Sequence, residues 1–272
     1  MSTPPDSPRP SPSSPGGPPF PGLLGALWLV LASMFLEVLL APLLRDAGGL
    51  GRDESAALAR LMANAALFSG LAAFTGLSYR ALFHAGSASA GAVLGLTLLP
   101  VLALVPGLVV VETALVNWVE ALVPLSAWEQ QAFESMGAPT LGAILMACVL
   151  APVLEEMLFR GVILRAFLQR YPRGVAIVHS AGIFGLAHMN LYQFVVALTI
   201  GLVTGWLYER TRSLWPCIAL HAAYNSSLTW LALNTPAGAE ADIGHSSAGL
   251  ALAGALLAAW WLKRCLQPAR AR

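Results

Sequence analysis

The apolar residues of this chain fall into long runs that are separated by short polar or Pro- and Gly-rich stretches. A run of about 17 to 25 apolar residues is long enough to cross the hydrocarbon core of a bilayer as an α-helix. On length and apolar content we predict helices over residues 22–43, 56–78, 88–114, 139–169, 174–189, 192–209, 213–233 and 247–263. The pattern therefore predicts an all-α integral membrane protein, a bundle of about eight transmembrane helices.

Three stretches differ from this pattern. Residues 1–21 are rich in Pro and Ser and have no apolar period, so we expect a disordered tail and not a signal peptide. Residues 126–140, "SAWEQQAFESMGAPT", are too polar to span, and we expect a helix along the membrane surface. Residues 265–272 should form a short basic tail.

The composition supports a membrane protein and excludes a large soluble module. Hydrophobic residues make up 57% of the 272 residues, charged residues only 11%, and the mean hydropathy is +0.70. The net charge of +1 gives no sign of a nucleic-acid partner, and we expect none. Cys148, Cys217 and Cys265 lack CxxC spacing, so neither a disulfide framework nor a thiolate metal site is indicated.

The basic residues predict the orientation in the membrane. With both termini in the cytoplasm, most of the basic residues fall on the cytoplasmic side, as the positive-inside rule requires. A single lysine, Lys263, among fifteen basic residues suggests a GC-rich bacterium, so we expect a multi-pass protein of the bacterial cytoplasmic (inner) membrane. The residues assigned to the cytoplasmic side are Arg9, Arg80, Arg165, Arg170, Arg173, Arg210, Arg212, Lys263, Arg264, Arg270 and Arg272.

Three charges stand close together inside a predicted span, in the stretch "LEEMLFRG" (154–161). Residues four apart share a helix face, so Glu156 and Arg160 can form an ion pair, whereas Glu155 is rotated by about 100°. A lone carboxylate facing lipid is costly. We therefore expect Glu155 to face the interior, either protonated or paired with a group on another helix.

Two later spans offer polar groups at a similar depth. Phe184 and His188 are four residues apart in "FGLAH", and His221 and Asn225 are four apart in "HAAYN". At about 1.5 Å rise per residue, both histidines, Asn225 and Glu155 lie roughly 14 to 22 Å from the cytoplasmic edge. These residues should converge near the middle of the membrane. His179 is half a turn out of phase and is expected to lie elsewhere.

The three stretches resemble the signatures of a known family. "EEMLFR" (Glu155, Glu156, Arg160), "FGLAH" and "HAAYN" are similar to the EExxxR, FxxxH and HxxxN motifs of the CPBP intramembrane proteases, which include the type II CAAX prenyl endopeptidases. The resemblance covers about residues 139–233. It implies a catalytic transmembrane core over residues 139–264, preceded by three N-terminal helices and the surface helix in residues 22–138.

The resemblance implies a peptide hydrolase that acts inside the membrane, with roles for each motif residue. Glu155 would be the general base for a water and His188 would orient that water or share its proton. His221 and Asn225 would donate hydrogen bonds to the oxyanion. Three further motif residues would support the site: Glu156, Arg160 and Phe184.

A metal-dependent version of the site is the main mechanistic alternative. Glu155, His188 and His221 are all zinc-ligand types, and they would be the ligands of such an ion. We favour a glutamate-activated water without a cofactor, because no HExxH helix is present and the resemblance implies it. The other intramembrane protease chemistries are disfavoured, since the aspartates lie outside the predicted spans and no GxSG stretch occurs.

Two functions of other classes compete with proteolysis, and haem ligation by the two motif histidines is a weaker third. A proton-coupled transporter would also bury charged groups, but no internal repeat is evident. A non-proteolytic scaffold or regulator would retain the fold without the chemistry. As a protease, the protein would take a membrane-anchored protein or peptide as its partner, for example a C-terminal sorting tail. Glu37 and Glu112 lie in predicted spans without an assigned partner.

Overall fold

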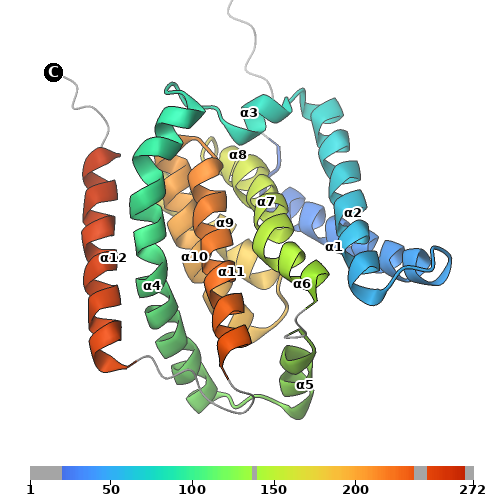
Figure 1. Cartoon of the computed structure of the whole chain (residues 1–272). Helices are drawn as coiled ribbons and strands as arrows, with labels where there is room; N and C mark the ends of the chain where they lie inside the picture. The colour runs from blue at the N-terminus through green and yellow to red at the C-terminus, as the bar shows by residue number, and fades with distance from the viewer. Residues whose placement is uncertain (1–19, 137–139, 236–243, 267–272) are drawn as a thin grey trace, which may run out of the picture.

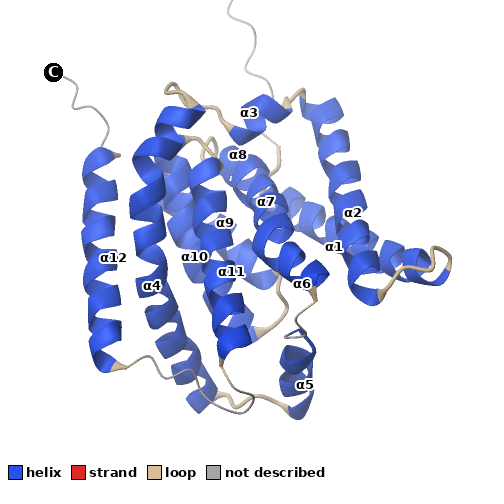
Figure 2. Ribbon diagram, in the orientation of Figure 1, coloured by secondary structure: helices blue, strands red, loops and turns tan. Residues whose placement is uncertain are grey.

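The computed structural model describes residues 20–136, 140–235 and 244–266, and nearly all of this part of the chain is helical (Figures 1 and 2). An isolated bridge between His84 and Ser213 is the sole β-type pairing in these ranges. The prediction of an all-α bundle is confirmed. The tail predicted over residues 1–21 and the basic end lie largely outside the described residues.

Each predicted span corresponds to a helix or a continuous helical run. Six of them are both long and apolar enough to cross a membrane, and they include the run from Leu141 to Phe167. Of the other two, α9 has 14 residues, and α11 has 20 residues but carries several polar side chains. The helices are α1 (Leu23–Asp46), α2 (Arg52–Thr75), α3 (Tyr79–Phe83), α4 (Ala90–Leu122), α5 (Ala127–Met136), α9 (Arg173–Leu186), α10 (Leu191–Thr211), α11 (Trp215–Asn234) and α12 (His245–Cys265).

Several helix ends differ from the prediction. Helix α4 continues to Leu122, because the residues after 114 are still largely apolar, and it tolerates Pro100 and Pro106. Helices α1 and α2 extend into the mixed loop between them, so Asp46 and Asp53 lie in terminal turns and not in a loop. The helix expected at the membrane surface exists as α5.

The helix that carries the three clustered charges is not a regular α-helix. It consists of α6 (Leu141–Leu145), η1 (Met146–Leu150), α7 (Ala151–Glu156), η2 (Met157–Leu164) and α8 (Arg165–Phe167), where η marks a π-helix. A π-helical turn holds more residues than an α-helical turn and is often found at functional sites. Glu155 and Glu156 thus lie at the junction between an α-helical and a π-helical segment.

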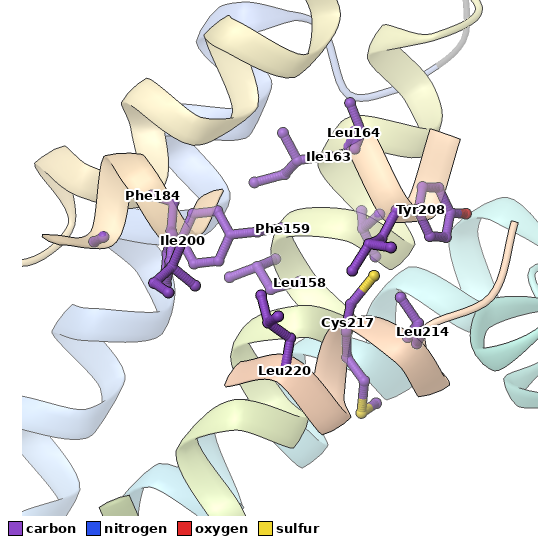
Figure 3. Close-up of a cluster of buried hydrophobic side chains, with 14 of the residues drawn as sticks. Leu158, Phe159, Ile163, Leu164, Phe184, Ile200, Tyr208, Leu214, Cys217 and Leu220 are labelled. Carbon is purple, nitrogen blue, oxygen red and sulfur yellow. The ribbon is translucent and has the colours of Figure 1, made fainter. Parts of the chain in front are cut away.

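This irregular helix lies at the centre of the bundle. Helices α12 and α4 pack together on one side of it, and the α1–α2 pair lies on the other (Figure 1). Every residue of η2 is buried. Its side chains form one apolar core with residues of α9, α10 and α11, as Figure 3 shows for Leu158, Phe159, Ile163, Leu164, Phe184, Ile200, Tyr208, Cys217 and Leu220.

Candidate active site

The residues predicted to form the site come together around one cavity of about 580 Å³. Glu155 comes from α7, His188 from the turn after α9, and His221 and Asn225 from α11. Phe184 also lines this cavity. Helices separated by up to about 70 residues of sequence thus bring the four polar groups to one place, as the depth calculation required.

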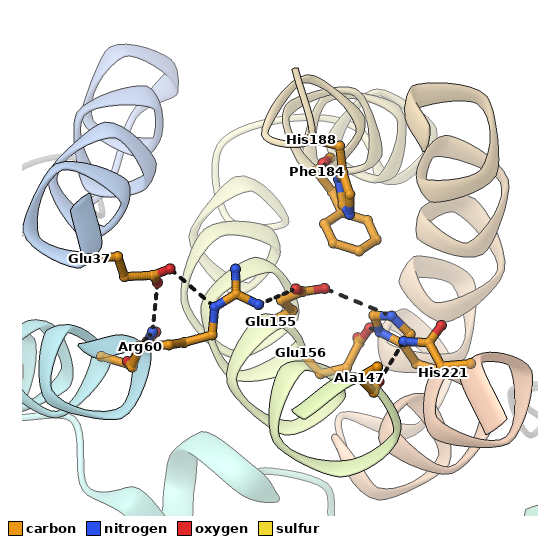
Figure 4. Close-up of polar contacts among 10 residues, drawn as sticks. Glu37, Arg60, Ala147, Glu155, Glu156, Phe184, His188 and His221 are labelled. Atoms are coloured by element: carbon orange, nitrogen blue, oxygen red, sulfur yellow. Dashed lines mark hydrogen bonds and ion pairs between the residues drawn. The ribbon is translucent and has the colours of Figure 1, made fainter. Parts of the chain in front are cut away.

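Glu156 lies in a fully buried ionic cluster. Its carboxylate Oε1 accepts a bond from Arg160 Nη1 at 3.0 Å. The same oxygen lies 2.9 Å from Nδ1 of His221 (Figure 4). The side chains of Glu156 and Arg160 are both 0% exposed. The Arg160 guanidinium also lies over the ring of Phe184, 4.6 Å from its centroid. Glu156 therefore connects the EExxxR helix to the histidine of α11.

Glu155 lies on the cavity side of this cluster and is partly accessible, with 21% of its side chain exposed. Its Oε1 lies 3.6 Å from Arg60 Nη1, and its Oε2 lies 3.8 Å from His221 Nε2 (Figure 4). Both distances are ion-pair contacts longer than a hydrogen bond. The partner that we expected for Glu155 on another helix is thus present. It consists of His221 and of Arg60, which belongs to none of the three motifs.

Arg60 is also the ion-pair partner of Glu37. Arg60 on α2 donates from Nε to Glu37 Oε2 at 3.1 Å, and Asn64 Nδ2 lies 3.4 Å from the other oxygen of Glu37. Glu37, which has no assigned partner in the sequence analysis, therefore has one, because α1 and α2 pack side by side. The sign in the sequence that could have identified Arg60 is a charge in the middle of an apolar run. Glu112 is buried in α4 and lies beside the Tyr224 hydroxyl.

The hydrogen bonds of the two histidines indicate which ring nitrogen carries the proton. His188 Nδ1 lies 3.0 Å from the carbonyl oxygen of Phe184, which can only accept, so Nδ1 is the donor. In a neutral ring, Nε2 of His188 then has a free lone pair. For His221, Nδ1 is directed at Glu156 and Nε2 at Glu155. His179 packs against Phe167 and Tyr171, away from these groups.

Asn225 links α11 to the first π-helical segment. Its Nδ2 donates to the carbonyl oxygen of Ala147 at 2.8 Å. An amide nitrogen carries two hydrogens, so one N–H of Asn225 remains for another acceptor. This contact fixes the amide at the wall of the cavity.

A second, more polar cavity of about 300 Å³ lies on the α1–α2 side of the site. Glu37, Arg60 and Asn64 line it. Glu155 and His188 line this cavity as well as the first one, so they lie on the wall between the two. The two cavities can therefore bring different molecules to the same carboxylate.

Within the described ranges, no three side chains of His, Cys, Asp or Glu are grouped closely enough to hold a metal ion. Glu155 and His221 are ion-pair partners, whereas the Nδ1 of His188 is used by the Phe184 carbonyl. The zinc alternative and the cofactor-free alternative both stay predictions.

Comparison with known proteins identifies the part of the chain that contains the motifs. Residues 137–227 match the family described as "Type II CAAX prenyl endopeptidase Rce1-like". A Bacillus subtilis (strain 168) protein named "Putative membrane peptidase YdiL" is 30% identical over 83 residues, which are 30% of this chain and 34% of that protein. The chain thus matches about a third of the length of this curated relative.

No solved structure matches the chain. The matched segment nevertheless contains all three motifs and the α7–η2 junction. Residues 137–227 are therefore similar to the type II CAAX prenyl endopeptidase Rce1-like family.

Proposed function

We propose that the protein is an intramembrane endopeptidase that hydrolyses a peptide bond with a water activated by Glu155. The observation that carries this proposal is the convergence of Glu155, His188, His221 and Asn225 on one cavity. A general base, a second proton-accepting group and donors for an oxyanion are the parts that peptide hydrolysis needs. The family match over residues 137–227 supports the same reaction class.

The cavity of about 580 Å³ beside Glu155 suits an apolar peptide segment. Its remaining walls are made mainly of apolar side chains from α4, α10 and α11, namely Val116, Val196, Ala197, Ile200 and Leu228, with Leu125 from the segment after α4. A membrane-anchored protein or peptide would place its apolar residues against these walls. One scissile carbonyl would then face Glu155.

The reaction we propose uses one water molecule. Glu155 takes a proton from the water, and the resulting hydroxide attacks the carbonyl carbon of the scissile bond. The lone pair on His188 Nε2 accepts a hydrogen bond from the same water and orients it. When the tetrahedral intermediate breaks down, the proton held by Glu155 goes to the leaving amine, so the enzyme returns to its starting state.

The oxyanion is assigned to donors on α11. Asn225 offers its second Nδ2 hydrogen, because the first is bonded to Ala147. His221 offers Nε2–H in its doubly protonated form, in which Nδ1–H is bonded to Glu156. Each such donor is worth about 3 to 4 kcal/mol in other oxyanion holes. Glu156 and Arg160 hold His221 in place and do not meet the substrate.

We propose that no metal takes part. Glu155, His188 and His221 would be the ligands of a zinc ion, which would polarise the water in place of a general base. The two versions differ in their response to chelation. Loss of cleavage after treatment with a chelator, with recovery on addition of zinc, would contradict the cofactor-free version.

The test in cells compares protein termini. Membrane and secreted proteins are collected from cells that carry the wild type, Glu155→Ala or His188→Ala, and their termini are identified by mass spectrometry. We expect a set of termini in the wild type that both variants lack. If all three strains accumulate the folded protein and show the same termini, proteolysis is rejected and the scaffold and transporter functions gain support.

A further inference from the structure

The charged groups of the site form one continuous chain across five helical elements, α1, α2, α7, η2 and α11. It runs from Glu37 on α1 through Arg60 on α2 to Glu155, and from there through His221 to Glu156 (Figure 4). It ends at Arg160, the ion-pair partner of Glu156. Acidic and basic groups alternate along it. The part of the chain from Glu155 onward belongs to the EExxxR and HxxxN motifs, whereas Glu37 and Arg60 belong to helices outside the family match.

Arg60 is placed between two carboxylates and is held from both sides. Its Nε donates to Glu37 at 3.1 Å, while its Nη1 lies 3.6 Å from Glu155. Asn64, one turn further along α2, bonds the backbone carbonyl of Arg60 at 2.9 Å and approaches Glu37. These contacts fix the guanidinium with one edge toward Glu37 and the other toward Glu155.

The position of Arg60 is not explained by holding α1 to α2 alone. An Arg60–Glu37 pair would be enough for that purpose, yet the guanidinium also reaches the carboxylate at the junction of α7 and η2. Its side chain is 33% exposed and lines the polar cavity, on the same wall as Glu155 and His188. A guanidinium fixed at one side of a carboxylate restricts the orientation of that carboxylate, and a general base must be held within hydrogen-bond reach of the proton that it takes.

We propose that Arg60, oriented by Glu37, is a positioning residue that holds the Glu155 carboxylate at the boundary between the two cavities. Its effect on cleavage rests on the proposed function, because it acts through Glu155. The groups that face Glu155 are Arg60 from α2 and His221 from α11, with His188 on the same cavity wall. Arg60 is the one permanently charged cation among them.

The electrostatic part of this proposal can be tested without a substrate. The Glu37→Gln protein and the Glu37→Gln/Arg60→Gln protein are compared in lipid nanodiscs at pH 7 by infrared spectroscopy. Both lack Glu37, so Glu155 is the carboxylate that loses its cation. We expect the double variant to gain a shifted carboxylate stretching band, because the ion pair to Glu155 is lost, and we expect Glu155→Gln to remove that band.

The functional part is read from the Glu155-dependent termini in cells. Arg60→Gln should reduce the cleaved fraction roughly tenfold or more, since a general base contributes about 10²- to 10⁴-fold. Arg60→Lys keeps the charge and should recover most of the cleavage. Glu37→Gln should reduce the cleaved fraction less than Arg60→Gln does, because it leaves Arg60 beside Glu155. Arg52→Gln removes the same charge from an exposed position on α2 and should change nothing.

Different results would contradict the electrostatic part and the functional part of this proposal. No new carboxylate band in the double variant would overturn the proposal that Arg60 holds the Glu155 carboxylate. Equal cleavage by Arg60→Gln and the wild type would overturn the positioning role. If no terminus depends on Glu155 while the band still appears, the proposed function fails and the electrostatic link stands.

Discussion

The two sides of the α7–η2 helix use the same kind of side chain for different purposes. Glu156 is 0% exposed and is surrounded by Arg160 and His221, whereas Glu155, the adjacent residue, is 21% exposed and lies between two cavities. The buried side carries groups that fix the helices in place. The cavity side carries groups that can meet water and substrate, so damage to the two sides should have different consequences.

The largest expected effect on the buried side comes from Arg160. Arg160→Met removes the cation from a fully buried pair and leaves Glu156 uncompensated, which costs about 3 to 5 kcal/mol of folding free energy. Denaturation by SDS in mixed micelles measures this loss. Arg52→Gln, an exposed charge removal, serves as the control. If Arg160→Met has the same free energy of unfolding as the wild type, the Glu156–Arg160 pair does not stabilise the fold.

On the cavity side, Asn225→Ala should reduce the cleavage rate by about 10²- to 10³-fold, because it removes a proposed oxyanion donor. The stability loss should be smaller, about 1 kcal/mol, from the lost bond to Ala147. Single-turnover cleavage and SDS denaturation measure the two quantities on one preparation. Ser227→Ala, which removes a hydroxyl bonded to a carbonyl on the same helix, should leave the rate unchanged.

A glycine on the buried side allows a finer test. A Cβ at Gly201 would lie 2.9 Å from Ala181 Cβ and 3.3 Å from Arg160 Nη2. Gly201→Ala should therefore cost about 1 to 3 kcal/mol of stability through overpacking. Gly182→Ala has open space and should be neutral or slightly stabilising. Equal effects of the two substitutions would contradict the close packing of α10 against α9 and Arg160.

The smallest effect is expected at α5, on the cavity side. Glu129 accepts bonds from the backbone and hydroxyl of Ser126 and from Asn190, which precedes α10 close to His188. The Ser126 bonds lower the pKa of Glu129. A lowered pKa in the folded state stabilises the protein above the unfolded pKa, and this contribution is lost as the pH falls through the folded value.

Glu129→Gln should consequently lower the melting temperature slightly at neutral pH. At a pH below the folded pKa of Glu129, the variant and the wild type should melt together. Thermal denaturation followed at both pH values checks this. A difference that persists in acid would show that the carboxylate charge is not what stabilises α5.

Much of the fold follows from the pattern of apolar residues, because a helix that spans a bilayer must satisfy its own backbone and be apolar over a fixed length. Hydropathy placed the helix ends within a few residues for α9, α10, α11 and α12. It did not predict η1 and η2, since a change from α- to π-helical hydrogen bonding leaves the apolar pattern unchanged. It also ended α4 too early.

The residues of the site could be predicted from the sequence only where they belong to one of the three motifs. Spacing within one helix predicted the Glu156–Arg160 pair, and depth predicted the meeting of Glu155 with His188, His221 and Asn225. The contact with Arg60 depends on how α2 packs against the core, which no spacing along the chain encodes. An arginine within an apolar run was the available sign, because such a charge needs a partner inside the bundle.

The most direct test of the account is a cleavage assay with purified protein in lipid vesicles. The substrate is a peptide that spans a Glu155-dependent cleavage site found in cells, and the wild type is compared with Glu155→Gln, which has nearly the same shape. We predict that Glu155→Gln folds and melts as the wild type does and yet loses cleavage by at least about 10²-fold. Cleavage at the wild-type rate by a folded Glu155→Gln protein would contradict the assignment of Glu155 as the base.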